Sequence, residues 1–197
     1  MGYLNSLPGF CIRGENYNAL SHLSDFYRAA KKTTGQVGKK SMQPVHPWYG
    51  ADLIKINEVK EAIRDTFVNT ILKPPSDATV IGCKEIRVNW NEITDIDVFL
   101  TEVMEIFDDA KIIFNHRDIL ATSKSSWWKD TAHSYATIRA MDQRLRENMY
   151  AKAPNVFHVE YEELIKAPEH ARKLTEFLGV PFDRPSYEKV LATRHSY

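Results

Sequence analysis

Apolar residues follow two alternating patterns along the chain. Continuous apolar runs at residues 10–12, 79–83, 111–115 and 156–159 are typical of strands buried on both faces of a sheet. Between them, apolar stripes at helical spacing predict helices around residues 20–30, 59–71, 96–107 and 132–151, with Asn57 as the N-cap of the second. This alternation predicts an α/β fold with a mostly parallel sheet and right-handed crossovers.

Breaker residues set the limits of two further segments. A last apolar stripe through Leu174 and Leu178 stops at Gly179, and Pro181 prevents its continuation. Residues 33–50 are rich in Gly, Lys and Pro, so we expect a surface loop there. The loop contains Gly35-Gln36-Val37-Gly38-Lys39-Lys40-Ser41, whose glycines are too close for a Walker A loop and which follows a helical pattern. A nucleoside triphosphatase is therefore not indicated by this motif.

Composition narrows the class of protein. The chain has 197 residues, enough for one domain over residues 1–197, and 43% of them are hydrophobic. Its 26 Lys and Arg balance 26 Asp and Glu, so no overall field favours nucleic acid or an anionic membrane. Cys11 and Cys83 lie in apolar runs and are expected to be free thiols, and no metal motif occurs. We find no signal peptide or membrane segment, and the expected location is cytoplasmic.

A candidate phosphate site follows the apolar run that ends at His116. Arg117 lies at the carboxyl end of this predicted strand, where ligands gather in open α/β sheets, and a guanidinium binds phosphate through two parallel hydrogen bonds. A helix beginning near Asp118 would place Ala121, Ser125 and Trp128 on one face, so that the Ser125 hydroxyl joins Arg117. The alternative is that Arg117 pairs with a nearby carboxylate and Ser125 is a surface residue.

Two other predicted strands are also followed by charged residues. Glu15 comes after the run at 10–12, and Lys84 comes after the run at 79–83. In a parallel sheet these residues and Arg117 emerge at one rim, which suits transfer of an anionic group, with Glu15 as general base and Lys84 as the balancing charge. The alternatives are a solvated Glu15 and a Lys84 paired with Glu85.

These segments together resemble the sulfotransferases that use 3′-phosphoadenosine 5′-phosphosulfate (PAPS), in particular the tyrosylprotein and carbohydrate branch. Residues 4–15 resemble the helix, turn and strand that end in the family's Gly-Glu, and residues 82–87 resemble its second strand end. Arg117 and Ser125 match the residues that hold the 3′-phosphate of the donor. Residues 159–164 and 174–179 resemble the penultimate segment, and the tail at 194–197 resembles the start of the last donor-binding loop.

The resemblance implies a mechanism and a fold. Glu15 would be the catalytic base, Lys84 would face the sulfuryl group, Arg117 and Ser125 would bind the 3′-phosphate, and Tyr161 would lie near the adenine. PAPS would be the donor, no metal would be needed, and the acceptor would be a hydroxyl or amine of a carbohydrate, peptide or small molecule. The fold would be a three-layer α/β sandwich of the P-loop nucleotide-kinase-like kind. The oligomeric state is not indicated.

One part of the family pattern is missing from the sequence. The family begins with a strand and a phosphosulfate loop of the form Arg-Ser-Gly-Ser/Thr-Thr-x-Leu, and no such loop occurs here. We therefore expect an N-terminally incomplete sulfotransferase fold with impaired activity. The alternatives are a non-catalytic fragment or pseudoenzyme that binds adenosine 3′,5′-bisphosphate (PAP) or pairs with a full-length copy, and a kinase of related fold.

Two residue types have no assigned role in this scheme. The aromatic residues are expected to pack in the core rather than stack on an acceptor. The histidines show no metal-ligand spacing and are expected to be structural. The residues concerned are Trp48, Tyr49, Trp90, Trp127 and Trp128, and His46, His116, His133 and His158.

Overall fold

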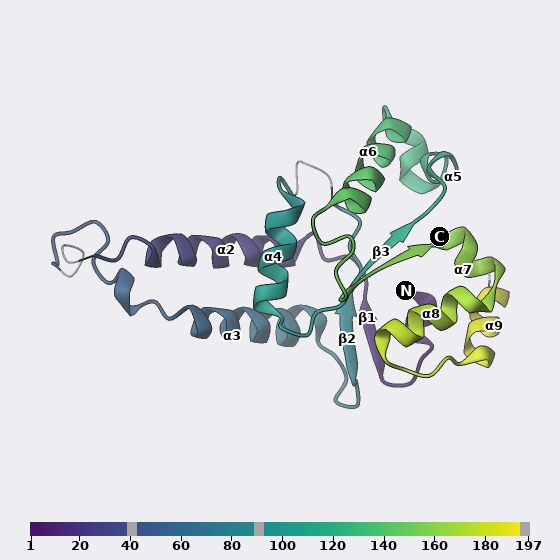
Figure 1. Ribbon diagram of the computed structural model, residues 1–197, viewed down its shortest axis with the longest axis horizontal. Helices are drawn as coiled ribbons and strands as arrows, with labels where there is room; N and C mark the ends of the chain where they lie inside the picture. Colours follow the sequence, from purple (N-terminus) through teal and green to yellow (C-terminus); the bar gives the residue numbers. More distant parts are fainter. Residues whose placement is uncertain (39–42, 89–92, 194–197) are drawn as a thin grey trace. The chain divides into compact units, whose positions relative to one another are not determined.

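A computed structural model describes residues 1–38, 43–88 and 93–193, without the side chains of residues 126 and 127. The chain divides into two compact units (Figure 1). Unit 1 comprises Met1–Ile12 and Ala110–Tyr197, and unit 2 comprises Arg13–Asp109. Helices alternate with short strands, which confirms the predicted α/β class. The single domain over residues 1–197 stays a prediction.

Unit 1 contains a pair of parallel strands, β3 (Ile112–His116) and β4 (Val156–Glu160). Their register pairs Phe114 with His158 and His116 with Glu160. Paired residues of parallel strands point to the same side of the sheet. Along one strand, successive residues point to opposite sides, so every second residue shares a face. One face of the pair is therefore lined by these four residues, and it lies toward α6 (Ser134–Glu147), as Figure 1 shows.

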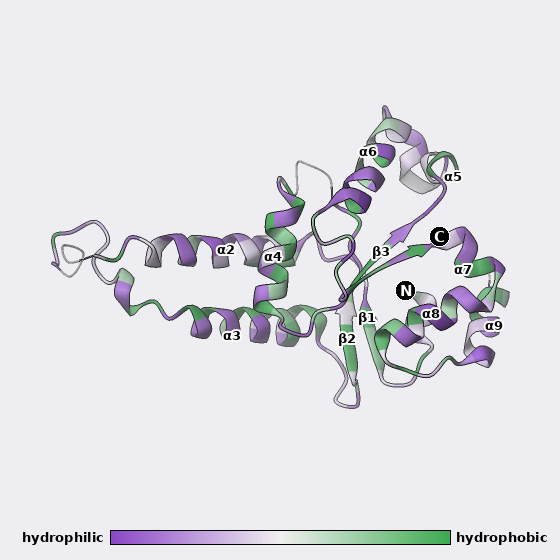
Figure 2. Ribbon diagram, in the orientation of Figure 1, coloured by the Kyte–Doolittle hydropathy of each residue, from purple (hydrophilic) through white to green (hydrophobic). Residues whose placement is uncertain are grey.

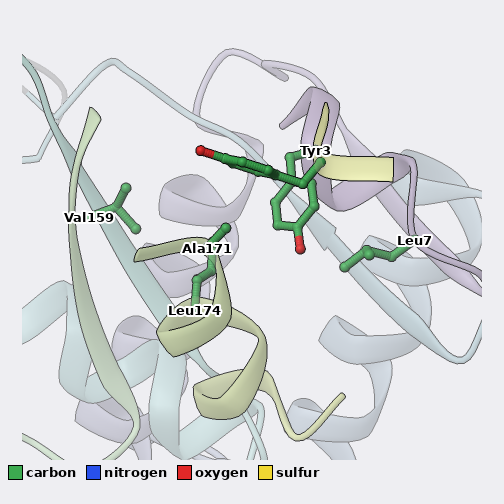
Figure 3. Packing of buried hydrophobic residues seen from close by; sticks show 6 residues of the cluster. Tyr3, Leu7, Val159, Ala171 and Leu174 are labelled. Carbon is green, nitrogen blue, oxygen red and sulfur yellow. The ribbon is translucent and has the colours of Figure 1, made fainter. Parts of the chain in front are cut away.

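The opposite face of β3 and β4 belongs to the hydrophobic core of unit 1. Val159 packs with Ala171 and Leu174 of α8 (Pro168–Leu178), as Figure 3 shows. Phe157 stacks on Phe177 at 5.1 Å between ring centroids. α1 (Gly2–Asn5), α7 (Tyr161–Lys166) and α9 (Arg184–Ala192) surround this core through Tyr3, Leu7, Leu164 and Tyr187. Gly179 ends α8 with a left-handed φ of 80°, which confirms the predicted stop.

Unit 2 is built mainly on three helices, α2 (Ala19–Thr34), α3 (Ile56–Thr66) and α4 (Ile96–Ile106). Hydrophobic and hydrophilic residues alternate along α2 and α3 (Figure 2), and their apolar sides meet around Tyr27, Ile63 and Ile106. A short π-helix (Phe67–Leu72) extends α3 and leads to β2 (Val80–Cys83). A 3₁₀ turn (Ala51–Leu53) precedes α3.

Strand β1 (Phe10–Arg13) confirms the first predicted strand. Its last residue, Arg13, belongs to unit 2, where its carbonyl accepts a hydrogen bond from the Lys84 N–H at 2.9 Å. The Arg13 guanidinium donates to the carbonyls of Leu72 and Lys73, each at 2.6 Å. The residues that follow β1 and β2 are thereby fixed to one another within unit 2.

Two helix predictions were wrong in detail. Asn57 is not an N-cap, because α3 begins at Ile56 and its N-cap, Lys55, makes no side-chain capping bond. The helix predicted over 132–151 spans only Ser134–Glu147. It ends because Asn148 takes an extended conformation and its side-chain amide donates to the Leu145 carbonyl at 2.6 Å.

Candidate functional site

In unit 2, Glu15 forms ion pairs with two cations. Its carboxylate lies 2.5 Å from the Lys84 ammonium and 3.0 Å from the Arg87 guanidinium, one contact on each oxygen. The side chains of Glu15 and Lys84 are 29% and 44% exposed, so both are open to a ligand. We call Glu15, Lys84, Arg87 and Glu85 the Glu15 cluster. The structure thus confirms that Glu15 and Lys84 come together after their strands.

Glu85 anchors the Glu15 cluster to the backbone. Its carboxylate accepts backbone N–H groups from Asn18 at 3.0 Å, from Ile86 at 2.8 Å and from Arg87 at 3.1 Å. Burial alone would raise the pKa of this carboxyl, but the backbone hydrogen bonds outweigh burial and hold the pKa below its usual value. An ionised Glu85 therefore ties the loop after β1 to the loop after β2.

The loop after β1 has an unusual backbone. Tyr17 and Asn18 both have left-handed φ values, 55° and 54°, which non-glycine residues seldom adopt. The Asn18 amide donates to the Arg87 carbonyl at 2.6 Å, and the Arg87 guanidinium lies over the Tyr17 ring at 4.3 Å from its centroid. These contacts stabilise the turn and orient Arg87 toward Glu15.

Sequence reasoning missed part of the Glu15 cluster. Lys84 pairs with Glu15 and not with Glu85, because the Glu85 carboxylate is occupied by backbone N–H groups and by Arg87 at 3.2 Å. In the sequence analysis, Arg87 was included in the segment 82–87 but had no role in the site. Its position, three residues after Lys84, was the available signal that a second cation follows the same strand.

In unit 1, Arg117 and Tyr161 follow the ends of β3 and β4. Because His116 pairs with Glu160, the next residue of each strand end lies beside its counterpart, and the Arg117 guanidinium carbon is 5.0 Å from the Tyr161 ring centroid. Arg117 is exposed, and none of the described residues forms an ion pair with it. The alternative interpretation, in which Arg117 pairs with a nearby carboxylate, is therefore not supported by the described residues. The carboxylate of Glu162, beside Tyr161 in the chain, accepts the Asp118 N–H at 3.1 Å.

The structure corrects the helix that was expected to carry Ser125. α5 spans only Ile119–Ser123, Ser125 is extended, and a separate 3₁₀ turn (Ser126–Asp130) follows. Asp118 caps the helix through Ala121, but the hydroxyls of Thr122, Ser123 and Ser125 all donate to backbone carbonyls three or four residues back. Such bonds compete with helix continuation. Ser125 therefore does not share a helical face with Trp128.

The Ser125 hydroxyl donates to the Thr122 carbonyl at 2.8 Å. No hydrogen bond joins it to Arg117 in the part of the chain that the structure describes. To donate to a phosphate, this hydroxyl would have to rotate away from Thr122. Arg117 and Tyr161 are therefore in contact, and Ser125 is not bonded to either.

An ion-pair network connects α6 to the strand residues that precede Arg117 and Tyr161. The Arg146 guanidinium of α6 binds Glu160 through two bonds, at 2.6 and 3.0 Å, and Asp142 at 2.8 Å. The hydrogen bond from Arg146 is the main reason that the pKa of Glu160 is lowered. Burial would raise the pKa of Asp142, but hydrogen bonds from Arg146 and His116 lower it overall. These contacts join α6 to the ends of both strands.

The remaining residues named in the sequence analysis either lie away from the Glu15 cluster and Arg117 in the sequence or fall outside the described residues. Trp48 and Tyr49 are 43% and 59% exposed, so the prediction that they pack in the core was wrong; they lie in a turn-rich segment interrupted by Pro47. Lys39, Lys40, Ser41 and Trp90, the tail from Arg194 to Tyr197 and the Trp127 side chain fall outside the described residues.

The described cysteine, histidine and acidic side chains do not form a metal site. Cys11 and Cys83 are free thiols, as predicted, and burial raises the pKa of the Cys83 thiol. Within residues 1–38, 43–88 and 93–193, no group of three or more His, Cys, Asp or Glu side chains is arranged to hold a metal ion. Among the same residues no helix is both long and apolar enough to cross a bilayer.

Comparison with known proteins identifies a family that the chain matches. A model of the sulfotransferase family matches residues 3–184, which is most of the chain. The matched range includes Glu15, Lys84, Arg117, Ser125 and Tyr161. No curated protein and no solved structure gave a significant match.

Proposed function

The chain belongs to the sulfotransferase family, and on that premise we propose that it transfers a sulfuryl group from PAPS to a hydroxyl or amine acceptor. Sulfuryl transfer is the general activity that the family implies. The donor, the acceptor and the roles of individual residues are the parts of this proposal that experiment has to test.

The observation that carries the proposal is the exposed Arg117 guanidinium at the carboxyl end of β3. It has no carboxylate partner among the described residues, and the Tyr161 ring lies beside it at 5.0 Å. A cation that lacks an acidic partner attracts an anion, and arginine binds phosphate with two charge-assisted hydrogen bonds. A neighbouring aromatic ring offers a flat surface to a purine. In the proposal Arg117 binds the 3′-phosphate, Tyr161 packs near the adenine, and Ser125 adds a hydrogen bond after its hydroxyl rotates.

The Glu15 cluster supplies the groups for the transfer step. The acceptor O–H or N–H gives its proton to the Glu15 carboxylate while the acceptor atom forms a bond to sulfur. The bond between sulfur and the bridging phosphate oxygen breaks, and the electron pair leaves with PAP. Lys84 balances the negative charge on the oxygens of the transferring group. Because Lys84 and Glu15 are paired, this step requires Lys84 to move from Glu15 to the sulfuryl oxygens.

The same pairing favours a second candidate function. Both oxygens of Glu15 contact cations, so in the arrangement described Lys84 is held by the carboxylate and is not available to a sulfuryl group. A protein that stayed in this arrangement would bind PAP at Arg117 without catalysis. The two functions share the nucleotide site and differ only in whether the Glu15 cluster opens.

Calorimetry and a transfer assay test both candidates. PAP and ATP are titrated into the full chain and into Arg117→Ala, with Arg172→Ala as the matched control, since Arg172 is a half-exposed arginine of unit 1 that also lies over an aromatic ring. We expect PAP to bind in preference to ATP and its affinity to fall roughly 30-fold or more in R117A, for the loss of a bidentate contact. R172A should bind like wild type.

A preference for ATP, or equal binding by R117A and wild type, would overturn the nucleotide assignment. Transfer of labelled sulfate from PAPS to a mixed panel of hydroxyl and amine acceptors then separates the two functions. Turnover supports the enzyme, whereas binding of PAP without turnover supports the non-catalytic protein.

A further inference from the structure

A partly buried chain of hydrogen bonds lies on the face of β3 and β4 that points toward α6 (Figure 1). His116 Nδ1 is 2.6 Å from the Asp142 carboxylate, His116 Nε2 is 2.7 Å from His158 Nδ1, and His158 Nε2 is 2.9 Å from the Ala151 carbonyl oxygen. The two rings are nearly parallel, at 7°, and His116 is only 1% exposed. We call His116, His158 and Asp142 the histidine chain.

The histidine chain needs one proton more than its neutral rings supply. Each of its three links requires one hydrogen between two electronegative atoms, and two neutral imidazoles carry one N–H each. A carboxylate and a carbonyl oxygen only accept. With both rings neutral and Asp142 ionised, two acceptor atoms would face each other without a hydrogen at one of the three links, at 2.6, 2.7 or 2.9 Å depending on the tautomers. A third proton must therefore be held in the chain.

The surrounding charges show where this proton resides. Burial is the main cause that lowers the pKa of His158, and the neighbouring His116 and Arg146 lower it further, against the Ala151 carbonyl, which raises it. Asp142 has its pKa lowered by Arg146 and His116 despite burial. The positive charge is therefore best placed on His116, next to the Asp142 carboxylate.

With that proton present, the charges on this face are balanced. β3 contributes the His116 cation, α6 contributes Asp142 and Arg146, and β4 contributes the neutral His158 and Glu160. Two positive and two negative groups then offset each other. Loss of the proton leaves a net negative charge and a repulsive contact at one of the three links.

This face ends at the nucleotide site. His116 is bonded to Arg117, and Glu160 is bonded to Tyr161, so a disturbed strand end moves the first residues that would contact a phosphate or a purine. We propose that His116 is a positioning residue for Arg117 and Tyr161, and that the proton it shares with His158 makes anion binding dependent on pH. This inference rests on the proposed function of Arg117.

The test compares PAP binding at two pH values. As the pH rises from about 6.5 to about 9, we expect the affinity of wild type to fall about five-fold relative to His158→Asn. Asparagine places an amide near the position of Nδ1 and donates to His116 Nε2, so H158N needs no extra proton. His22→Asn, an exposed residue of α2, is the matched control and should follow wild type. Ionisation of the PAP phosphates is common to all three proteins and cancels.

A second measurement observes the proton itself. Nitrogen-15 NMR of the histidine rings at about pH 7 should show one imidazolium and one neutral ring in wild type, and a neutral His116 in H158N. Two neutral rings in wild type would overturn the inference. So would PAP binding that depends on Arg117 but changes equally with pH in wild type and H158N. If wild type does not bind PAP at all, the proposed function fails, and the NMR result still decides whether the proton is shared.

Discussion

The Glu15 cluster and the Arg117 site balance their charges in opposite ways. In the Glu15 cluster, two carboxylates and two cations contact one another, and the exposed members are already paired. At the Arg117 site, the exposed cation lies beside a neutral ring, and the paired charges lie behind it, between α6 and the strand ends. In the Glu15 cluster the candidate reactive groups neutralise one another, whereas at the Arg117 site the neutralised charges belong to neighbouring residues.

The difference separates binding from chemistry. A phosphate can approach Arg117 without displacing a carboxylate, so anion binding requires little rearrangement. Lys84 and Glu15 must separate before either can act on a substrate. The charges that support the Arg117 site should contribute mainly to stability, and those of the Glu15 cluster mainly to turnover.

The largest expected effect is on turnover. Glu15→Gln should lower the rate of sulfuryl transfer roughly 100- to 10,000-fold, the range for loss of a general base, and should leave PAP affinity unchanged. The control is Glu188→Gln, an exposed glutamate of α9 that forms an ion pair with Arg184. The rates are measured at saturating PAPS. Equal turnover by E15Q and wild type would remove Glu15 from the mechanism and leave the Glu15 cluster as a structural contact.

The next effect is on stability and compares one cation from each region. Arg146→Met should lower the free energy of unfolding by about 2 kcal/mol, because Asp142 and Glu160 lose their common partner, although partial exposure of the guanidinium limits the cost. Lys84→Met should cost less than about 1 kcal/mol, since it removes a single exposed ion pair and Glu15 keeps its contact with Arg87. Urea unfolding measures both. If K84M proved the more damaging variant, the contrast between the two regions would be reversed.

The strands and the residues that follow them could be predicted from the sequence. β1, β2, β3 and β4 were predicted because each is a continuous apolar run, and Glu15 and Lys84 were paired by the rule that parallel strands end at one rim. The rule needs no knowledge of side-chain contacts. It also placed Arg117 and Tyr161 after their strands, where the register of β3 and β4 brings them together.

The parts that depend on local competition or distant partners could not be predicted in the same way. The helix after Asp118 was expected to include Ser125 because spacing alone was considered, whereas the run of hydroxyl residues ends the helix through bonds to its own backbone. His116 and His158 are 42 residues apart, and only the parallel register brings them to one face. Two histidines near the ends of predicted neighbouring strands were the available signal.

The two units should also respond differently to acid. The pKa of His158 in unit 1 is lowered, chiefly by burial, so the unfolded chain takes up a proton near about pH 6.5 that the folded chain takes up only at lower pH. The stability of unit 1 should therefore fall as the pH drops below about 6.5. In unit 2 the lowered pKa values belong to Glu85 and Glu105, so its stability should fall only below about pH 4.3.

Hydrogen exchange followed by mass spectrometry reads the two units separately. At about pH 5.5, after correction for the intrinsic rate of exchange, β3 and β4 should have lost protection relative to neutral pH, while α2 and α4 should have kept theirs. Parallel loss of protection in both units would show that His158 does not set the acid limit.

The smallest expected effect concerns two tyrosines in the core of unit 1. The rings of Tyr3 and Tyr187 meet edge to face at 5.8 Å, and the Tyr187 hydroxyl donates to the Leu164 carbonyl at 2.7 Å. The buried Tyr3 oxygen has no hydrogen-bond partner among the described residues, and burial is the main cause that raises the pKa of Tyr3 to about 12. Tyr3→Phe should therefore leave stability unchanged or raise it by up to about 1 kcal/mol, whereas Tyr187→Phe should lower it by about 1 kcal/mol. Each variant is the control for the other, because each removes one hydroxyl from the same ring pair. Urea unfolding that ranked Y3F below Y187F would mean that the Tyr3 hydroxyl is satisfied, and that unit 1 leaves none of these buried polar groups without a partner.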